Sequence, residues 1–321
     1  MTASALRRVR VAEVEDVAEA IKRFRLVDVA GSPLPTFSAG SHVVVTMHDG
    51  KGRVWKNPYS LIRPPSDPNG YEISVLRCAT SRGGSAYMHE HVAPGAELEI
   101  SDPVNLFPVV GLGRKHILVA GGIGITPFLA IMKELAARGA DFELHYKVRS
   151  LARGAFCNDL RQQYGERVHI YRSDQGEALP LQTILGRQPL GTHMYVCGPA
   201  AMIDWALQVG RDAGWPVENL HSEKFTAPPP GHAFTVKLAR SHRDIIVGPQ
   251  QSILEALEQN GVDAPCLCRG GACGQCETRV LSCEEGLQHN DHYLTEEEKA
   301  SGEKVMICVS RARGGSLTLD L

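Results

Sequence analysis

The alternation of apolar and polar residues changes twice along the chain, and each change predicts a different kind of secondary structure. In the first part, short stretches such as the apolar residues 43–45 and the alternating apolar and polar residues 71–77 are separated by turns and show no long helical pattern. Asp49 and Gly50 form one such turn, since this pair accepts the positive φ angles of a tight hairpin. Residues 1–110 therefore predict an antiparallel β-barrel.

A continuous apolar run at residues 117–120 opens the second pattern, and it is typical of a parallel strand that is covered on both faces. A helix is expected to follow, with Thr126 as its N-cap, Pro127 at its first position and Gly139 beyond its end. A second strand, turn and helix occupy residues 194–213. This alternation predicts an α/β domain with a parallel sheet over residues 111–226, which binds ligands at the carboxyl ends of its strands.

The third pattern begins after three consecutive prolines, which cannot join a helix or a central strand. Residues 227–232 are therefore expected to form a stiff, extended linker. Beyond it, residues 234–238 and 244–247 read as a hairpin, and Ser252 with Glu255 reads as a capping box that opens a short helix. Residues 233–321 are expected to form a third domain.

Charge and hydropathy narrow the possible partners. The 321 residues carry 34 basic and 36 acidic side chains, so the formal charge of −2 gives no general attraction to nucleic acid or to an anionic membrane. The opening residues lack the apolar core of a secretory signal. The uncharged stretch at residues 116–132 contains glycines and a proline in place of the roughly 20 apolar residues of a membrane span. We expect a cytoplasmic protein with no nucleic-acid or membrane partner.

Five of the nine cysteines crowd into residues 266–283, which points to metal binding and not to disulfides. Four cysteines have the spacing C-x4-C-x2-C followed by a distant fourth, by which plant-type ferredoxins hold a [2Fe–2S] cluster. The intervening glycines let backbone amides turn toward the cluster and stabilise its negative charge. The candidate metal ligands are Cys268, Cys273, Cys276 and Cys308.

The alternative for these cysteines is a zinc site. Zinc sites usually contain two C-x2-C pairs, and this segment has one, although His289 and His292 could complete a site on paper. The spacing therefore favours iron and sulfide over zinc. Cys266 and Cys283 fall outside the spacing and are expected to be ordinary thiols.

Two turns of the α/β domain predict a nicotinamide site. Each follows a strand and precedes a helix, where glycine lets a diphosphate approach the backbone and the helix N-terminus attracts its charge. The first turn lacks the G-x-G-x-x-G fingerprint, so tight strand–helix packing is the alternative reading. Cys197 has no histidine partner indicated by sequence, which argues against covalent catalysis. The candidate residues are Gly121, Gly122, Gly124, Thr126, Pro127, Cys197, Gly198 and Pro199.

Two polar turns of the barrel predict a flavin site. Arg82, the following glycine amides and Ser85 at a helix start make a phosphate cradle, and Tyr59 offers a flat face for the flavin ring. Taken alone, such a turn is also compatible with an ordinary loop. The candidate residues are Asn57, Pro58, Tyr59, Ser60, Val75, Arg77, Arg82, Gly83, Gly84 and Ser85.

These modules, in this order, resemble the phthalate dioxygenase reductase family, flavin reductases that carry a C-terminal plant-type ferredoxin domain. The likeness covers essentially the whole chain and rests on the motifs above together with residues 221–225. It implies FMN in the barrel, NADH in the α/β domain, and a β-grasp-like ferredoxin domain. It also implies that the cluster passes electrons to a separate Rieske-type terminal oxygenase.

The resemblance also implies roles for single residues. Phe225 would cover the flavin, while Ser60 and Thr126 would orient the reacting rings. The family's flavin motif is R-x-Y-S, but Asn57 stands at the arginine position in this chain. Asparagine cannot neutralise a phosphate, so we expect Lys56, Arg77 or Arg82 to supply the charge.

A flavin between NADH and the cluster explains why the three sites belong in one chain, because NADH gives two electrons as hydride and a [2Fe–2S] cluster takes one at a time. The predicted protein is a monomeric, NADH-dependent oxygenase reductase. The alternatives are a reductase that carries FAD and serves another acceptor, and a redox sensor or electron-transfer subunit that does not oxidise NADH. The choice of NADH over NADPH stays open, since Arg149 and Arg172 lie near the expected adenosine ribose.

Overall fold

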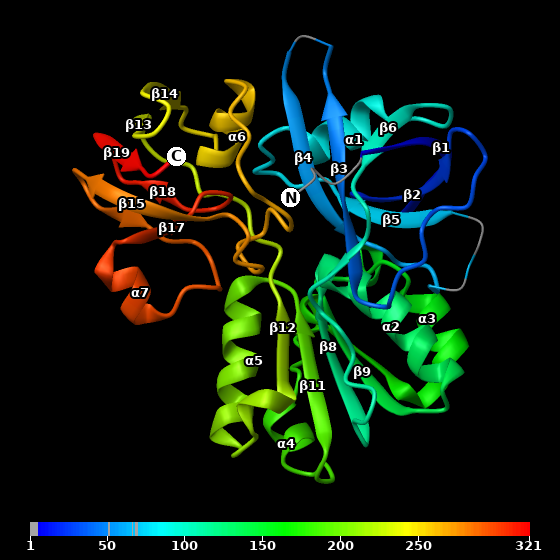
Figure 1. Cartoon of the computed structure of the whole chain (residues 1–321). Helices are drawn as coiled ribbons and strands as arrows, with labels where there is room; N and C mark the ends of the chain where they lie inside the picture. The colour runs from blue at the N-terminus through cyan, green and yellow to red at the C-terminus, as the bar shows by residue number, and fades with distance from the viewer. Residues whose placement is uncertain (1–5, 51, 66, 68–69) are drawn as a thin grey trace. The chain divides into compact units, whose positions relative to one another are not determined.

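The computed structural model describes residues 6–50, 52–65, 67 and 70–321 (Figure 1). The chain forms two compact units, Met1–Lys224 and Phe225–Leu321. The first five residues of the opening segment and Lys51 after the predicted hairpin turn lie outside the described residues. Of the helices in the described ranges, none has both the length and the apolar character needed to cross a bilayer.

The first sheet is antiparallel, with the strand order β4-β3-β6-β1-β2-β5, and β7 pairs with β3. Its two ends meet, because the amide of Ile62 after β4 donates to the Glu72 carbonyl of β5 at 3.0 Å. Phe24, Val45 and Ile73 are among the buried residues that fill its interior. The elements are β1 (Arg7–Ala18), β2 (Ile21–Asp28), β3 (Ser41–His48), β4 (Val54–Ser60), β5 (Tyr71–Leu76), α1 (Gly84–His91), β6 (Glu97–Ile100) and β7 (Val104–Asn105). The predicted antiparallel barrel is confirmed.

The second sheet is parallel throughout, with the order β10-β9-β8-β11-β12. Its strands are β8 (Lys115–Gly121), β9 (Asp141–Val148), β10 (Val168–Arg172), β11 (Thr192–Cys197) and β12 (Leu220–Glu223). The helices are α2 (Thr126–Ala137), α3 (Cys157–Tyr164), α4 (Leu181–Leu185) and α5 (Ala200–Asp212). Short 3-10 turns connect them, namely η1 (Gly122–Ile125), η2 (Leu151–Arg153), η3 (Gly165–Arg167), η4 (Ser173–Gln175) and η5 (Val217–Asn219).

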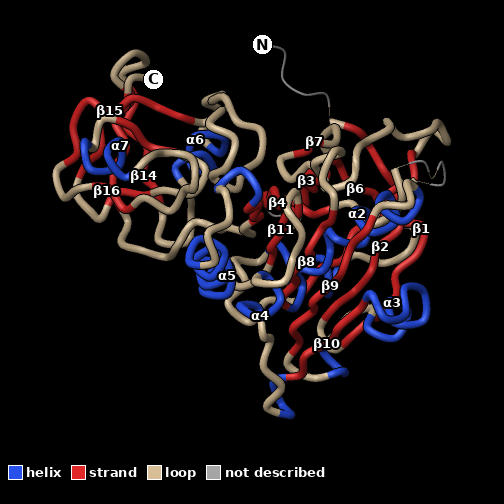
Figure 2. Tube along the Cα trace, turned by 90° about the horizontal axis from the view of Figure 1, so that it is seen from below, coloured by secondary structure: helices blue, strands red, loops and turns tan. Residues whose placement is uncertain are grey.

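Both faces of this parallel sheet are covered, as the apolar run in β8 predicts. Leu118 and Ala120 pack toward α2 and α3, whereas Ile117 and Val119 pack toward α4 and α5. Figure 2 shows the two pairs of helices on opposite flanks of the strands. Side chains on both faces of such a strand are buried against helices, so successive residues are all apolar, which explains the continuous run.

The start of α2 differs from the prediction. Ile125 is the N-cap and Thr126 is the first helical residue, so Thr126 is not the cap that the sequence predicts. The 3-10 turn η1 extends the helical path ahead of Thr126, whose hydroxyl donates back to the Ile123 carbonyl at 3.0 Å. The predicted stop is correct, since Gly139 follows the C-cap with a φ of +66°.

The second unit is a mixed sheet of order β14-β13-β19-β15-β17, in which β13 and β19 run parallel. The predicted capping box is present, with Ser252 Oγ accepting from the Glu255 amide at 3.0 Å and the Glu255 carboxylate accepting from the Ser252 amide at 2.9 Å. The elements are β13 (Phe234–Leu238), β14 (Arg243–Val247), α6 (Ile253–Gln259), β15 (Glu277–Cys283), β16 (Leu287–Gln288), α7 (Glu296–Ser301), β17 (Lys304–Met306), β18 (Arg311–Ala312) and β19 (Ser316–Leu319).

The proline segment at residues 226–232 contains no helix or strand and is hydrogen-bonded to the second unit. The Ala227 carbonyl accepts from Asn290 Nδ2 at 2.9 Å, and the Gly231 amide donates to Pro249 at 3.0 Å. The Arg311 side chain is fully buried and donates to the His232 carbonyl at 2.9 Å. These bonds hold the segment against the second unit and give it a fixed path.

Candidate functional site

The two glycine turns of the α/β domain touch each other at the carboxyl ends of β8 and β11, which are adjacent parallel strands. A Cβ added to Gly124 would lie 2.3 Å from the Cys197 carbonyl oxygen, and one added to Gly121 would lie 2.8 Å from Pro199 Cδ. Glycine at these two positions therefore serves the packing of one turn against the other.

Gly122 differs from its neighbours. It has a φ of +54°, and a Cβ at this position would meet no atom within 4 Å. Its carbonyl accepts a hydrogen bond from the buried Tyr146 hydroxyl at 3.0 Å, which fixes the turn. The packed glycines and the open one together leave a surface of backbone to which a diphosphate has access.

Glu223 lies beside Cys197 on the neighbouring strand β12, and it is not among the site residues that the sequence predicts. Burial raises the pKa of Glu223 to about 8, so its carboxyl group is largely protonated at neutral pH. Its Oε2 atom is buried and has no hydrogen-bond partner among the described residues. A bound amide group would supply the hydrogen-bond partner that this buried oxygen lacks.

Cys197 itself is fully buried, and burial raises the pKa of its thiol well above the usual value. A protonated, inaccessible thiol is a poor nucleophile. Thr126, which follows the first turn, is buried as well. In the sequence, Glu223 is indicated only as a member of residues 221–225, one of the motifs of the family resemblance, which is a weak signal without the structure.

The two flavin turns of the barrel pack on each other. A Cβ on Gly83 would lie 2.6 Å from the Trp55 indole, and one on Gly84 would lie 2.4 Å from Asn57 Nδ2. The φ of Gly83 is +120°, which only glycine adopts readily, and α1 begins at the next residue. The Arg-Gly-Gly-Ser turn therefore sits directly on β4, next to the predicted Asn-Pro-Tyr-Ser segment.

Side chains of β4 complete this turn. Asn57 Nδ2 donates to the Tyr59 hydroxyl at 3.2 Å, and burial raises the pKa of Tyr59 to about 12. Ser85 Oγ donates to Ser81 Oγ at 2.9 Å, and Ser81 Oγ accepts from the Gly83 amide at 3.0 Å. The serine hydroxyls thus hold the loop in shape.

The positive charges near the turn include Arg53, which is not among the residues that the sequence predicts for this site. Arg53 Nη2 and Trp55 Nε1 donate to the Arg82 carbonyl at 2.6 and 3.0 Å, and the Arg53 guanidinium lies 4.9 Å from the Trp55 ring. Arg77, by contrast, forms an ion pair with Glu90 at 2.5 Å. Arg53 and Arg82 are therefore the arginines placed at this turn.

The remaining predicted flavin residues belong to the strands around the turn. Ser60 is buried at the end of β4, opposite His42. Pro58 pairs with Val44 across the sheet, and Val75 is buried in β5. Lys56 neighbours Asn57 on β4, where alternate side chains face opposite sides.

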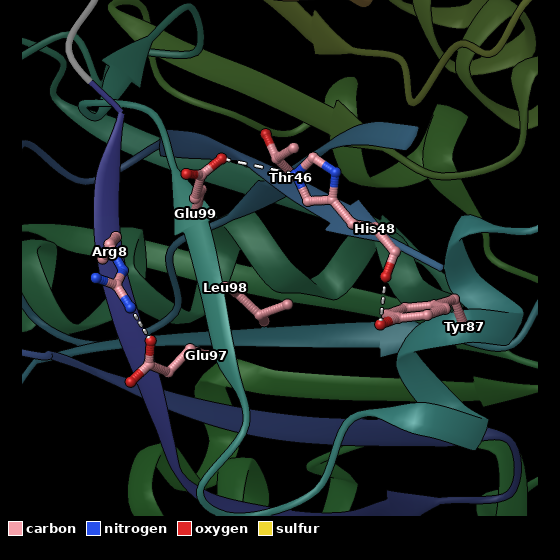
Figure 3. Close-up of a pocket in the computed structure, with 7 residues that line it drawn as sticks. All are labelled: Arg8, Thr46, His48, Tyr87, Glu97, Leu98 and Glu99. Atoms are coloured by element: carbon pink, nitrogen blue, oxygen red, sulfur yellow. Dashed lines mark hydrogen bonds and ion pairs between the residues drawn. The ribbon is translucent and has the colours of Figure 1, made fainter. Parts of the chain in front are cut away.

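A surface pocket of about 190 Å³ opens beside α1 (Figure 3). Its carboxylates are already engaged, Glu97 by Arg8 and Glu99 by His48 at 3.7 Å, and the Tyr87 hydroxyl donates to the His48 carbonyl at 2.8 Å. Two carboxylates in so small a space disfavour a phosphate. The lining residues are Arg8, Thr46, His48, Tyr87, Glu97, Leu98 and Glu99.

The four candidate cluster ligands come together in the second unit. Cys276 Sγ and Cys308 Sγ lie 3.1 Å apart, and the Gly270 amide donates to Cys268 Sγ at 3.4 Å. The hydrogen bond from the Cys273 thiol and those from backbone amides lower the pKa of Cys268 to about 5. Sulfur atoms that are close together and surrounded by amide donors fit an iron–sulfur cluster.

Tight glycines and one ion pair shape the cysteine loop. A Cβ on Gly274 would lie 2.3 Å from the Tyr293 ring, and one on Gly271 would lie 2.7 Å from Val309. Arg269, with a φ of +52°, forms an ion pair with Glu258 of α6. The close contacts of the glycines and the ion pair of Arg269 therefore fix the backbone of the cysteine loop.

The other two cysteines of this region have different surroundings. Cys266 lies with its sulfur 3.8 Å from Arg269 Nη2, and Cys283 lies at the end of β15. Both are partly buried against the apolar core of the second unit. Phe225 is the first residue of that unit and is half-exposed, so its role over a flavin stays a prediction.

Known proteins match this chain over nearly its whole length. Two protein-family models match, the "Dimethylamine monooxygenase subunit DmmA-like, N-terminal domain" at residues 105–220 and the "2Fe-2S iron-sulfur cluster binding domain" at residues 236–313. The carnitine monooxygenase reductase subunit of Acinetobacter pittii is 46% identical over 96% of this chain and 100% of its own length. The heme-dependent oxidative N-demethylase beta subunit of Ectopseudomonas mendocina is 45% identical over 99% and 100%.

Among solved structures, phthalate dioxygenase reductase superimposes with a TM-score of 0.88 at 35% identity, covering 99% of this chain and 98% of that one. That protein has a modular structure for electron transfer from pyridine nucleotides to [2Fe–2S]. The barrel, the parallel sheet and the cysteine domain thus follow one another in the same order in both chains.

Proposed function

Because this chain belongs to the family of oxygenase reductases that includes phthalate dioxygenase reductase, we propose that it transfers electrons from NADH through FMN to a [2Fe–2S] cluster. We further propose that the cluster reduces a Rieske-type terminal oxygenase. The observation that carries the proposal is the cysteine loop, where four sulfur ligands and amide donors converge in a chain that also holds two packed glycine turns.

The proposed flavin site involves the Arg-Gly-Gly-Ser turn, two arginines and three residues near the reacting rings. A bound flavin would supply the step from two-electron to one-electron transfer. The Arg-Gly-Gly-Ser turn on β4 would hold its phosphate, with Arg53 and Arg82 replacing the charge that Asn57 lacks. Ser60 and Thr126 would orient the rings, and Phe225 would cover the flavin.

We propose FMN and not FAD. The pocket beside α1 supports this choice, because its Arg8 is already paired with Glu97 and the second carboxylate, Glu99, would repel a further phosphate. Acid extraction of the purified protein followed by chromatography identifies the flavin directly. Recovery of FAD would contradict this part of the proposal.

For the nicotinamide half, the Gly122 turn would receive the diphosphate and the protonated Glu223 carboxyl would hydrogen-bond the carboxamide. NADH is favoured over NADPH at the carboxyl end of β10. There, Glu177 accepts from Arg172 Nη2 and Nε at 3.0 and 3.3 Å, and Asp174 lies close by. A 2′-phosphate would meet carboxylates and an arginine that is already paired.

A haem-dependent oxygenase is the second candidate partner. The observation that favours it is the relative named as an N-demethylase subunit, which is 45% identical to this chain. The vanillate O-demethylase oxidoreductases are 37–39% identical, so the relatives of higher identity are those named for carnitine and for N-demethylation. We therefore propose an oxygenase that attacks an N-alkyl group, supplied with electrons by a monomeric reductase.

Anaerobic stopped-flow mixing with NADH tests the electron path. The flavin absorbance should bleach first and the cluster absorbance should follow. If the flavin stays oxidised, the protein does not oxidise NADH itself, and the alternative of an electron-transfer subunit is the better description. Zinc in place of iron and labile sulfide would exclude the cluster. Reconstitution with Rieske-type and haem-dependent oxygenases, measuring NADH-dependent product, then separates the two partners.

A further inference from the structure

A group of metal-ligating side chains lies on the parallel sheet, apart from the glycine turns and from the cysteine loop. Glu143 and His145 belong to β9, and His169 belongs to the adjacent edge strand β10. One ligand atom from each residue lies within 4.8 Å of the others. Since Phe142, Leu144 and Tyr146 face α2 and α3, the alternating Glu143 and His145 face the side of α4 and α5.

The backbone fixes the spacing of these donors. His145 and His169 are directly opposite each other in the parallel register, and their rings stack at 4.8 Å with an interplanar angle of 11°. The lone pairs of stacked rings do not converge, so the exposed His169 ring must turn about its side-chain bonds to share an ion with His145. His145 Nε2 lies 3.3 Å from Glu143 Oε2. Two ligands of a tetrahedral zinc ion are separated by about 3.4 Å when each bond is roughly 2.0–2.1 Å long. The nitrogen–oxygen distance therefore already matches one edge of such a site.

The charges of the group suit a cation. His145 is buried, and burial together with the neighbouring His169 lowers its pKa to about 4, so its ring is neutral at pH 7. Burial is the largest single influence on Glu143 and opposes its ionisation. The hydrogen bonds and charges of Lys115, whose Nζ lies at 2.6 Å, and of His145 together outweigh burial and lower the pKa of the carboxyl. Lys115 occupies Oε1, which leaves Oε2 toward His145.

Tyr171 supports the histidine from the other side. Its hydroxyl lies 3.0 Å from His145 Nδ1. When His145 Nδ1–H donates to this oxygen, the lone pair of His145 Nε2 points at a Glu143 carboxylate oxygen. Both atoms are then acceptors, and a cation bound between them would remove their repulsion. The same atoms can instead be joined by a proton, with Tyr171 donating to Nδ1 and Nε2–H donating to Glu143. Metal binding distinguishes the two arrangements.

We propose that Glu143, His145 and His169 form a binding site for a divalent transition-metal ion, with Zn²⁺ as the best match to two imidazoles and one carboxylate. Water would complete the coordination. The bound ion would tie the edge strand β10 to β9, because His169 is the ligand from β10. The site is independent of the proposed electron path.

Equilibrium dialysis of the iron- and flavin-loaded chain against Zn²⁺ tests the site, with zinc and iron measured in the same sample. Retained iron shows that the cluster cysteines are occupied and do not take up zinc. We expect one zinc per chain, and affinity at least roughly tenfold weaker in His169→Gln. His169 is exposed on an edge strand, so this variant should fold normally. His232→Gln, which removes an exposed histidine of the second unit, is the matched control and should bind as the unmodified chain does.

One further variant and a second readout complete the test. Tyr171→Phe should weaken zinc binding by roughly tenfold if its oxygen positions His145. Hydrogen exchange at residues 168–172 should slow on adding Zn²⁺ in the unmodified chain and in His232→Gln, but not in His169→Gln. The proposal is overturned if His169→Gln binds zinc with unchanged affinity, or if zinc leaves exchange in β10 unaffected.

Discussion

The cysteine loop of the second unit and the Arg-Gly-Gly-Ser turn of the first are each proposed to hold a charged group, but they are assembled differently. Three of the four cysteines lie within residues 268–276, and the chain between them is the loop itself. The flavin turn instead rests on Trp55 and Asn57, which precede Gly83 and Gly84 by 28 and 27 positions. A local site carries its signature in residue spacing, whereas a site built across strands does not.

This difference predicts all-or-none damage in the cysteine loop. Replacing any one ligand by serine should remove the cluster, because each thiolate holds an iron, and should leave flavin reduction by NADH intact, because the flavin turns belong to the other unit. Iron, labile sulfide and NADH-dependent flavin bleaching are the measurements. The variants are Cys268→Ser, Cys273→Ser, Cys276→Ser and Cys308→Ser.

Cys266→Ser and Cys283→Ser are the controls, and both should keep a full cluster. If Cys266→Ser lost the cluster while Cys268→Ser kept it, the proposed assignment of ligands would be wrong. Loss of NADH-dependent flavin reduction in a variant that still binds flavin would show that the two units depend on each other for the first step.

The nicotinamide edge should respond to pH, through Glu223. Its pKa is about 8 in the folded protein and 4.5 in the reference state, so the unfolded chain loses this proton first as pH rises. The contribution to stability is complete below pH 4.5, falls as pH rises toward 8 and is gone above 8. Chemical denaturation should show a loss of roughly 3 to 5 kcal/mol across this range from Glu223 alone.

Glu223→Gln should remove this part of the pH dependence while preserving shape. The difference in unfolding free energy between variant and unmodified chain should therefore shift in favour of the variant from pH 5 to pH 9. Glu218→Gln, at an exposed position of η5, is the control and should leave the curve unchanged. Parallel curves for Glu223→Gln and the unmodified chain would show that the carboxyl ionises freely.

The flavin turn should fail by degrees. Arg82→Ala removes one of the two arginines at the turn and should weaken FMN binding about ten- to a hundredfold, since a hydrogen bond to a charged group is lost. Higher salt should weaken binding further in the unmodified chain. Fluorescence titration of the flavin-free protein measures both effects.

Arg53→Ala sharpens this result, because it removes the guanidinium that holds the Arg82 carbonyl. Arg77→Ala is the control, as Arg77 is paired with Glu90. Full flavin retention in Arg82→Ala together with its loss in Arg77→Ala would place the phosphate against β5 and not at the Arg-Gly-Gly-Ser turn.

The same distinction explains what the sequence could predict. The barrel, the doubly covered parallel sheet and the capping box of α6 are confirmed. They could be predicted because each depends on local periodicity or on residues that are neighbours in the sequence. The predicted N-cap at Thr126 is wrong because the preceding 3-10 turn depends on how Gly124 packs against Cys197, a residue from another strand.

The residues missed in the sites follow the same rule. Arg53 acquires its position at the flavin turn only when β4 and α1 meet. Glu223 becomes a buried, largely protonated carboxyl only because β12 pairs with β11. Neither consequence has a spacing that a single sequence could reveal.

The smallest effect is expected at the ribose end of the nicotinamide site. Glu177 holds Arg172 by two hydrogen bonds, so Glu177→Gln should free the guanidinium for a 2′-phosphate. We expect kcat/KM for NADPH to rise about three- to tenfold, while kcat/KM for NADH changes less, because a single exposed ion pair is weak. Glu166→Gln, an exposed acid in η3, is the matched control for the change in net charge. If both variants raised NADPH use equally, the effect would come from the overall charge of the domain and Arg172 would not contact the ribose end of the nucleotide.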